Sequence, residues 1–245
     1  MQRASLERYW RLQNRLVPGL RYSQRVYEDL LRTSQPRCLD WLDLGCGHQL
    51  LPPWRQAEES ELVSAARLVI GLDYDLQSLR RHRTIRARVR GDIGRLPFAD
   101  ESFDLVTSNM VGEHLAEPAR ALRETSRVMR RRGRLILHTP NLIGYSTLMA
   151  RLLPQAIKNV LVRRLEGREE EDVFPALYRM NTPRRIRQLA ESTGLRVVDL
   201  RLICSQAKFA TFAPLALLEL LWIRLLIMRG MKPLRTNILA ILEKP

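Results

Sequence analysis

Short apolar runs that alternate with helical patterns restrict the fold of this chain more than any other feature. The runs lie at residues 38–44, 67–72, 103–107, 134–138, 195–203 and 237–242, with a weaker one at 87–89. Runs of this length suit buried strands, and the segments between them are long enough for the helices that connect parallel strands. The pattern therefore predicts an α/β fold with a mainly parallel sheet.

Two helices between these runs carry signals at their ends. Apolar residues recur at helical spacing through Ala116–Arg131, and we expect Gly133 to cap the end of that helix. In the second helix Thr182 is the expected N-cap, Pro183 takes the first helical position and Gly194 ends the helix. Both helices therefore have predicted boundaries as well as a predicted face.

The length of 245 residues and an apolar content of 45% suit a single domain over residues 1–245. Within it we expect an N-terminal helical region at 1–36. The segments 141–181 and 207–233 exceed a minimal strand–helix alternation, and both are predicted to be insertions on the sheet. The second insertion, which lies between the last two strands, is strongly apolar.

The formal net charge of +15 favours anionic partners. Aromatic residues make up only 6% of the chain and the basic residues are scattered, so the composition does not favour nucleic acid, which usually needs aromatic stacking platforms. The three cysteines show neither a paired framework nor metal spacing. We therefore expect a reducing, cytoplasmic location.

Polar residues follow the apolar runs at the carboxyl end of each predicted strand. In a doubly wound sheet this is the edge where ligands bind. The residues there are Asp43, Gly45 and Gly47, then Asp73, Asp92, Asn109, Glu113, His114 and His138.

Four segments in series resemble the class I S-adenosylmethionine-dependent methyltransferases, in their small-molecule, type 11-like branch. They are "LDLGCG", "VIGLDYD", "RGDIGRLPFADESFDLVTSN" and "RRGRLILHTPN". The likeness covers about residues 37–141, with 182–203 and 235–243 as the closing helix and strands. It implies a doubly wound, seven-stranded, Rossmann-like sheet with helical insertions, and S-adenosyl-L-methionine as the cofactor.

The resemblance assigns the cofactor-binding residues. Gly45, Cys46 and Gly47 would approach the methionine part of the cofactor, since glycine allows close backbone contact and positive φ, and Asp43 would orient that loop. Further along the chain, Asp73, followed by Tyr74, resembles the acid that accepts both ribose hydroxyls. Asp92 resembles the acid that binds the adenine amino group, with Ile93 on the ring, and Asn109 would meet the methionine end.

Two other interpretations of these residues remain open. Each aspartate taken alone is also typical of a turn at the end of a strand. A dinucleotide site of the NAD type is the nearest competitor, but Leu50 stands where its third glycine belongs. The order of all four segments favours the methyltransferase interpretation.

Transfer of a methyl group to oxygen needs a base near the acceptor. Our first candidate is His114, and Glu113 and His138 are the others. In the alternative interpretation Glu113 caps the following helix and His114 packs against it. The Glu-His pair also resembles quinone-pathway O-methyltransferases and small-RNA 3′-end methyltransferases. Some of these bind a divalent metal through E-x-x-E-H, but Met110 replaces the first glutamate here, so we predict no metal.

The insertion at 141–181 lies where this family places elements that cover the acceptor. Phe174, Tyr178 and Arg179 are the candidate acceptor-binding residues, aromatic rings for an apolar acceptor and Arg179 for an anionic group. The alternative is that the two aromatic residues only pack the insertion onto the sheet.

The segment 209–228 has only Glu219 and Arg224 as charges. It is long enough to span a bilayer, but these charges and the need to return to the same sheet favour an element that lies on an anionic membrane surface. A dimerisation helix of a homodimer and a cover over the acceptor stay open. The predicted location is therefore cytoplasmic, with peripheral attachment to the inner face of the membrane.

The sequence as a whole predicts an S-adenosylmethionine-dependent methyltransferase that acts on a small or lipid-like acceptor, at oxygen. An RNA methyltransferase is one alternative, supported by the charge and the Glu-His pair. A non-catalytic protein that keeps the fold and binds a membrane or a partner is another.

Overall fold

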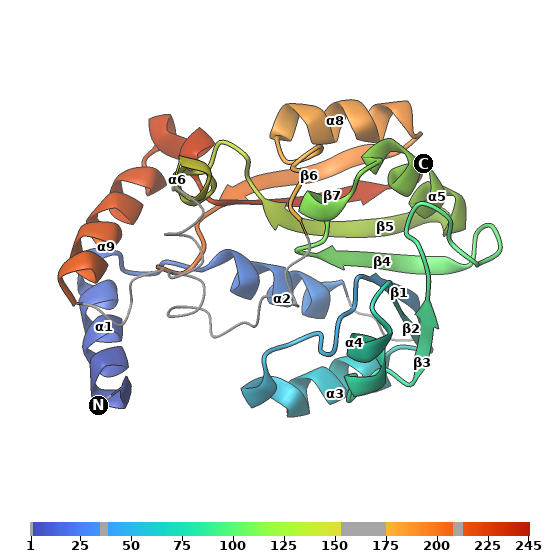
Figure 1. Ribbon diagram of the computed structural model, residues 1–245, viewed down its shortest axis with the longest axis horizontal. Helices are drawn as coiled ribbons and strands as arrows, with labels where there is room; N and C mark the ends of the chain where they lie inside the picture. Colours follow the sequence, from blue (N-terminus) through green and yellow to red (C-terminus); the bar gives the residue numbers. More distant parts are fainter. Residues whose placement is uncertain (1, 35–38, 153–174, 208–212) are drawn as a thin grey trace. The chain divides into compact units, whose positions relative to one another are not determined.

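A seven-stranded sheet organises the protein, as the computed structural model in Figure 1 shows; it describes residues 2–34, 39–152, 175–207 and 213–245. The strands are β1 (Asp40–Leu44), β2 (Leu68–Asp73), β3 (Ala87–Arg90), β4 (Phe103–Asn109), β5 (Met129–Pro140), β6 (Arg196–Ile203) and β7 (Asn237–Glu243). Their order across the sheet is β3-β2-β1-β4-β5-β7-β6. The chain thus winds outward from β1 in one direction and then in the other, so β1 and β4 flank the point where the strand order reverses.

The strands from β3 to β5 in this order pair in parallel, whereas β7 runs antiparallel to both of its neighbours. All five residues of β1 are buried. This agrees with an apolar run in a central strand of a sheet that is covered on both faces. The predicted fold, a doubly wound seven-stranded sheet, is therefore confirmed, including the weak third strand at the sheet edge.

Helices follow most of the strands. The α-helices are α1 (Gln2–Leu16), α2 (Ser23–Thr33), α3 (Gln56–Ala65), α4 (Leu76–Arg81), α5 (Pro118–Val128), α6 (Tyr145–Leu152), α8 (Pro183–Ser192) and α9 (Ala213–Ile227). The short 3₁₀ helices are η1 (Pro53–Arg55), η2 (Gly112–His114) and η4 (Arg229–Leu234). In the described ranges no helix has both the length and the apolar character needed to cross a bilayer.

The signals at the ends of α8 are confirmed. Thr182 is the N-cap and its Oγ1 accepts a hydrogen bond from the backbone N–H of Arg185. Pro183 begins the helix, and Gly194 follows its end with φ of +75°. An N-cap hydroxyl and a glycine in the left-handed region are the expected solutions for the unpaired groups at helix ends.

The predicted end of the helix at residues 116–131, which is α5 in the structure, is wrong. Helix α5 stops at Val128 and β5 begins at Met129, so Gly133 lies inside a strand rather than at a helix cap. The register between β4 and β5 shifts between Phe103 and Leu105. A Cβ on Gly133 would lie 2.8 Å from the carbonyl oxygen of Arg130, so this irregular pairing leaves room only for glycine.

The chain forms two compact units. The sheet unit contains residues 27–140, 176–201 and 238–245, and the helical unit contains residues 1–26, 141–175 and 202–237. In the helical unit α1 and α9 lie side by side, and the buried core of the unit includes Tyr9, Val17 and Leu220. The boundaries predicted for a single domain and its insertions stay a prediction.

Candidate functional site

The loop after β1 contains the two glycines that the sequence singled out. Gly45 and Gly47 both have positive φ, of +69° and +55°. The N–H of Gly45 donates to the carbonyl oxygen of Leu72 at 2.7 Å, which holds the loop against β2. A Cβ on Gly45 would lie 2.3 Å from a methyl group of Val111, whereas a Cβ on Gly47 would meet no atom within 4 Å. Gly45 is therefore required by packing, and Gly47 faces open space.

The residue between the two glycines has a structural contact. Cys46 is buried, and its sulfur would lie 2.7 Å from a Cβ placed on Gly71 of β2. Burial raises the pKa of the Cys46 thiol, so the thiolate form is suppressed. The side chain of Cys46 thus anchors the loop, and its backbone is the part that can face a ligand.

Asp73, at the end of β2, connects this loop to the neighbouring strand. Its Oδ2 accepts a hydrogen bond from the N–H of Gly47 at 2.8 Å, and its Oδ1 accepts one from the N–H of Asp75 at 2.8 Å. Its carbonyl oxygen accepts from the N–H of Gly91 at 3.0 Å, which places Asp92 next in the chain. The structure therefore brings Gly47, Asp73 and Asp92 to one edge of the sheet, as the sequence predicted.

Asp92 and Tyr74, the residue after Asp73, are more exposed than Asp73 itself. The Asp92 side chain is exposed and its Oδ1 accepts from the N–H of Gly94 at 2.8 Å, while Ile93 is half-buried. Tyr74 is exposed, and the Arg90 guanidinium lies 5.5 Å from the centre of its ring. Asp92 and Ile93 thus present one carboxylate and one apolar side chain at the same turn, the pair that the resemblance assigns to an adenine base.

Asp43 is buried on β1 and bonded across the sheet. Its Oδ1 accepts a hydrogen bond from the hydroxyl of Thr107 on β4, and that hydroxyl oxygen accepts from the indole N–H of Trp41 at 2.7 Å. The pKa of Asp43 is raised to about 7, mainly by burial; the bond from Thr107 lowers it, and the nearby carboxylates of Asp73 and Glu59 add to the rise. A cation at this edge would favour the ionised form of Asp43.

His138 and Asn109 form a second bonded pair, on β5 and β4. The two residues are register partners, and Nδ1 of His138 lies 2.7 Å from Oδ1 of Asn109. Because a carbonyl oxygen only accepts, Nδ1 carries the proton. The ring of Tyr27 stacks on the imidazole with centroids 5.6 Å apart. Burial lowers the pKa of His138 to about 4, so the ring is neutral at pH 7.

Glu113 and His114 lie in η2, just past β4. Glu113 is buried, and its Oε2 accepts a hydrogen bond from the hydroxyl of Thr139 at 3.0 Å. Nδ2 of Asn181 donates to the same hydroxyl at 2.7 Å. Nε2 of His114, whose side chain is 32% exposed, lies 3.9 Å from Oε1 of Glu113. Burial raises the pKa of Glu113, and nearby His114 is among the groups that lower it.

The alternative role of Glu113 as a helix cap is wrong, because the N-cap of α5 is Glu117, without a side-chain capping bond. Of the predicted acceptor residues, Phe174 lies outside the described residues. Tyr178 has φ of +54°, and its N–H donates to the carbonyl oxygen of Glu113 at 3.0 Å. Arg179 donates from Nη1 to the carbonyl oxygen of Ala116 at 2.7 Å. These two residues therefore lie beside η2.

Sequence reasoning missed four residues of this constellation. Thr107 holds Asp43, Tyr27 stacks on His138, and Thr139 with Asn181 holds Glu113. Thr139 and Asn181 stand in the "HTPN" and "NTP" segments, where a polar residue next to a predicted strand end or helix start was the available signal. Tyr27 gave no such signal.

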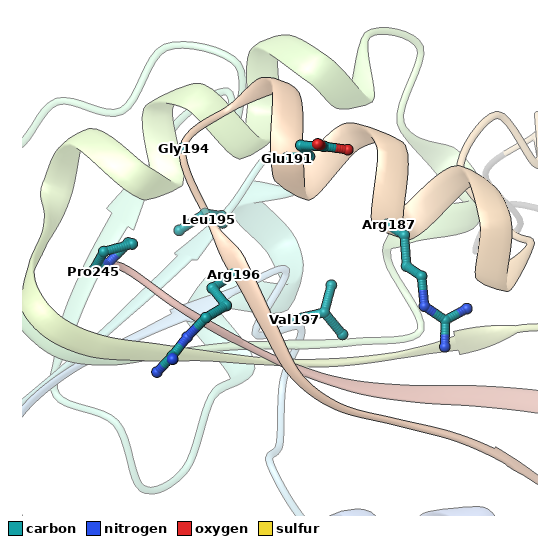
Figure 2. A pocket seen from close by; sticks show the side chains of 7 residues that line it. All are labelled: Arg187, Glu191, Gly194, Leu195, Arg196, Val197 and Pro245. Atoms are coloured by element: carbon teal, nitrogen blue, oxygen red, sulfur yellow. The ribbon is translucent and has the colours of Figure 1, made fainter.

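A separate hollow of about 570 Å³ lies beside α8 and the start of β6. Figure 2 shows Arg187 and Arg196 on opposite sides of it, with Val197 between them. Its lining contains none of the residues predicted for the cofactor or the acceptor. The constellation at the strand ends is therefore the candidate site.

Comparisons with known proteins place this constellation in a family. The family described as "Methyltransferase domain" matches residues 42–137, which include the end of β1, the candidate loop, β2, β3 and β4. Residues 42–137 form a class I S-adenosylmethionine-dependent methyltransferase domain. The predicted family is thus confirmed, and the cofactor of this domain family is S-adenosylmethionine.

Curated relatives of the methyltransferase domain include mycobacterial proteins. A protein of Mycobacterium tuberculosis named "probable S-adenosylmethionine-dependent methyltransferase" is 35% identical over 147 residues, 58% of this chain and 46% of that protein. A demethylmenaquinone methyltransferase of Mycolicibacterium paratuberculosis is 29% identical over 158 residues, 63% of this chain and 59% of that protein. The chain thus spans about half the length of the curated relatives it matches.

Solved structures share the fold of the methyltransferase domain at low sequence identity. An S-adenosylmethionine-dependent methyltransferase from Mesorhizobium loti has a TM-score of 0.57 at 18% identity, over 88% of this chain and 96% of that one. The [4+2]-cyclase SpnF has a TM-score of 0.56 at 16% identity, over 91% of this chain and 81% of that one. The chemistry must therefore be argued from the site residues.

Proposed function

We propose that this protein transfers a methyl group from S-adenosylmethionine to an oxygen atom of a small, lipid-like acceptor. The observation that carries the proposal is the convergence of Gly47, Asp73 and Asp92 at one sheet edge, linked by the bonds from Gly47 to Asp73 and from Gly91 to Asp73. This edge lies at the carboxyl ends of β1, β2 and β3, beside the point where the strand order reverses.

The residues at this edge fit such a cofactor. Gly47 faces open space where a side chain would otherwise stand. Each carboxylate oxygen of Asp73 accepts one backbone bond and keeps a second acceptor position for a ribose hydroxyl. Asp92 offers an exposed carboxylate to an amino group, and Asp43 supplies negative charge when a cation binds nearby. When bound, S-adenosylmethionine supplies a methyl group on a positively charged sulfur.

We assign the role of base to His114, oriented by Glu113. The His114 ring is partly exposed and can reach an acceptor hydroxyl, whereas His138 is 1% exposed. Glu113 lies beside the ring and is fixed by the hydroxyl of Thr139. A carboxylate next to an imidazole favours the protonated form that results when the ring removes a proton. We assign His138 to positioning, since it fixes Asn109 at the end of β4.

The lipid-like class of the acceptor is supported by the relatives and by the apolar surface of the chain. The names of four relatives state demethylmenaquinone as the molecule that is methylated. In this chain, α9 carries a row of exposed leucines, which suits a protein that meets apolar molecules at a membrane. The names support the proposal for this chain and do not identify its acceptor.

Calorimetric titration with S-adenosylmethionine tests the cofactor assignment. Asp73→Ala removes two charged acceptors, so affinity should fall by about 1.5–3 kcal/mol, roughly tenfold to a hundredfold. Asp199→Ala is a charge-matched control, because Asp199 lies on β6 in an ion pair with the exposed Arg201. Equal affinities of the Asp73 variant and the wild type would refute the ribose role.

Labelled methyl transfer tests the acceptor and the base. Wild-type protein should label a polar-lipid and quinone extract and leave RNA unlabelled, and label in RNA alone would refute the acceptor class. His114→Ala should lower turnover by about 10²–10⁴-fold with little change in cofactor affinity, as expected for the loss of a general base. Turnover equal to that of the wild type would remove His114 from the mechanism.

A further inference from the structure

Helix α9 buries one face and exposes another that is equally apolar. The buried face contains Ala216, Leu220, Ile223 and Leu226, which join α1 residues in the core of the helical unit. Most residues of α9 are apolar, so the helix has little difference in polarity between its faces. A helix of this composition is normally covered on all sides.

Several of the exposed apolar residues form a row along α9. Leu218, Leu221 and Leu225 recur at intervals of three and four residues, so they share a face of α9, and Met228 follows directly after the end of the helix. Their side chains are 63%, 40%, 47% and 61% exposed. We call these four residues the outer row. Scattered exposed leucines are ordinary, but a contiguous row marks a surface that meets an apolar partner.

Hydrogen bonds fix the end of α9 and the side chain of its one acid. The Arg235 guanidinium donates to the carbonyl oxygens of Leu226 at 2.9 Å and Ile227 at 2.7 Å, which satisfies two groups at the end of α9. On the buried side, the hydroxyl of Tyr145 donates to Oε1 of Glu219 at 2.9 Å, so the one acid of α9 is turned inward. The outer row therefore contains no acidic side chain.

The charge of the helical unit selects the kind of partner. Its residues 1–26, 141–175 and 202–237 contain sixteen arginines and lysines and seven acids. Arg224 is exposed on α9 itself, and Lys232 follows in η4. A second copy of this chain docked on the same face would bring two strongly basic surfaces together, which is unfavourable. A phosphate backbone would match the charge but leave the leucines exposed to water.

We propose that the outer row of α9 inserts into the surface of a membrane that contains anionic lipids. The leucines and Met228 would enter the boundary between headgroups and acyl chains, with α9 parallel to the membrane plane. Arg224 and Lys232 would meet lipid phosphates. No described helix is able to span a bilayer, so attachment is peripheral. The proposal rests on the helical unit and does not depend on cofactor binding by the sheet unit.

Vesicle flotation tests this proposal with the full chain. Wild-type protein should float with vesicles of about 70% phosphatidylcholine and 30% phosphatidylglycerol at about 100 mM salt, and bind pure phosphatidylcholine much less. Leu218→Ser combined with Leu225→Ser should weaken binding at least tenfold, because two inserted leucines are lost. Arg224→Glu should weaken binding to the anionic vesicles selectively.

The matched control combines Leu68→Ser with Val198→Ser, on β2 and β6, whose side chains are 43% and 46% exposed. This control should float like the wild type. Calorimetric titration of the same variants with S-adenosylmethionine reports folding of the sheet unit and separates the two proposals, since affinity should be unchanged in each variant.

Three results would overturn the proposal. The first is wild-type protein that stays at the bottom of the gradient with anionic vesicles while it still binds S-adenosylmethionine. The second is an outer-row variant that floats as well as the wild type. The third is a wild-type dimer in light scattering that the outer-row variant converts to a monomer, without flotation of either; a second copy would then cover the face.

Discussion

Replacement of Gly47 by alanine separates the binding role of the loop after β1 from its structural role. Gly47 has φ of +55°, and an added Cβ would meet no protein atom within 4 Å. The substitution therefore costs only the strain of a left-handed alanine, about 1–2 kcal/mol of the free energy of unfolding. The same Cβ would point into the space that we assign to the cofactor.

Gly194, which ends α8, is the matched control for this substitution. Its φ is +75°, and an added Cβ there also has no atom within 4 Å. Gly194→Ala should therefore lower the free energy of unfolding by a similar amount, about 1–2 kcal/mol. Gly194 lines the separate hollow beside α8, which contains none of the predicted cofactor residues, so Gly194→Ala should leave the affinity for S-adenosylmethionine unchanged.

The two variants are compared by urea unfolding and by calorimetric titration with S-adenosylmethionine. One extra carbon in a close contact costs about 1–3 kcal/mol, so Gly47→Ala should bind the cofactor roughly fivefold to a hundredfold more weakly. Wild-type affinity in Gly47→Ala would refute the claim that the cofactor approaches this residue. An equal loss of affinity in both variants would show that strain, and not contact, is the cause.

Three further predictions follow from the site. Gly45→Ala should lower the free energy of unfolding by about 2–5 kcal/mol, because backbone strain and a 2.3 Å clash with Val111 add to each other. In urea unfolding, the added substitution Val111→Ala should restore part of this loss. No restoration would contradict the clash. Between about pH 4 and 6.5, the free energy of unfolding of Asp43→Asn should rise with pH, because buried His138 resists protonation in the folded state. Over the same range the free energy of unfolding of His138→Asn should fall with pH, because buried Asp43 resists ionisation. Equal slopes of the free energy of unfolding against pH in the two variants would contradict both assignments. Thr139→Val removes a hydrogen-bond donor to Glu113, which should raise the pKa of Glu113. The acidic limb of the pH profile of turnover should therefore move to higher pH, with cofactor affinity unchanged. An unshifted limb would show that Glu113 does not act on the reaction.

The strand ends could be predicted from the sequence because parallel strands place their carboxyl ends at one edge. Asp43 lies near the end of an apolar run, and Asp73 and Asp92 each follow one, so their common location required only the fold class. The partners of these residues could not be predicted in the same way. Thr107 on β4 bonds to Asp43 on β1, and Asn181 bonds to Thr139 from a position 42 residues further along the chain. Such contacts depend on how the elements pack.

The wrong helix end has a related cause. Helical spacing of apolar residues continued past Val128, and Gly133 resembled a C-cap. In the structure, pairing with β4 begins at Met129, so strand pairing takes precedence over local helical propensity. The need for glycine at 133 comes from two carbonyl oxygens, of Arg130 and Phe103, that are brought close by the irregular register.

The central claim is that Gly47, Asp73 and Asp92 together bind the cofactor. A crystal structure of the protein with S-adenosylhomocysteine, the demethylated cofactor, tests it most directly. We predict that the ribose hydroxyls lie within hydrogen-bond distance of Asp73, the adenine amino group beside Asp92, and the amino-acid end against Gly45 and Gly47. A ligand bound away from all three residues, for example in the hollow beside α8, would contradict the claim.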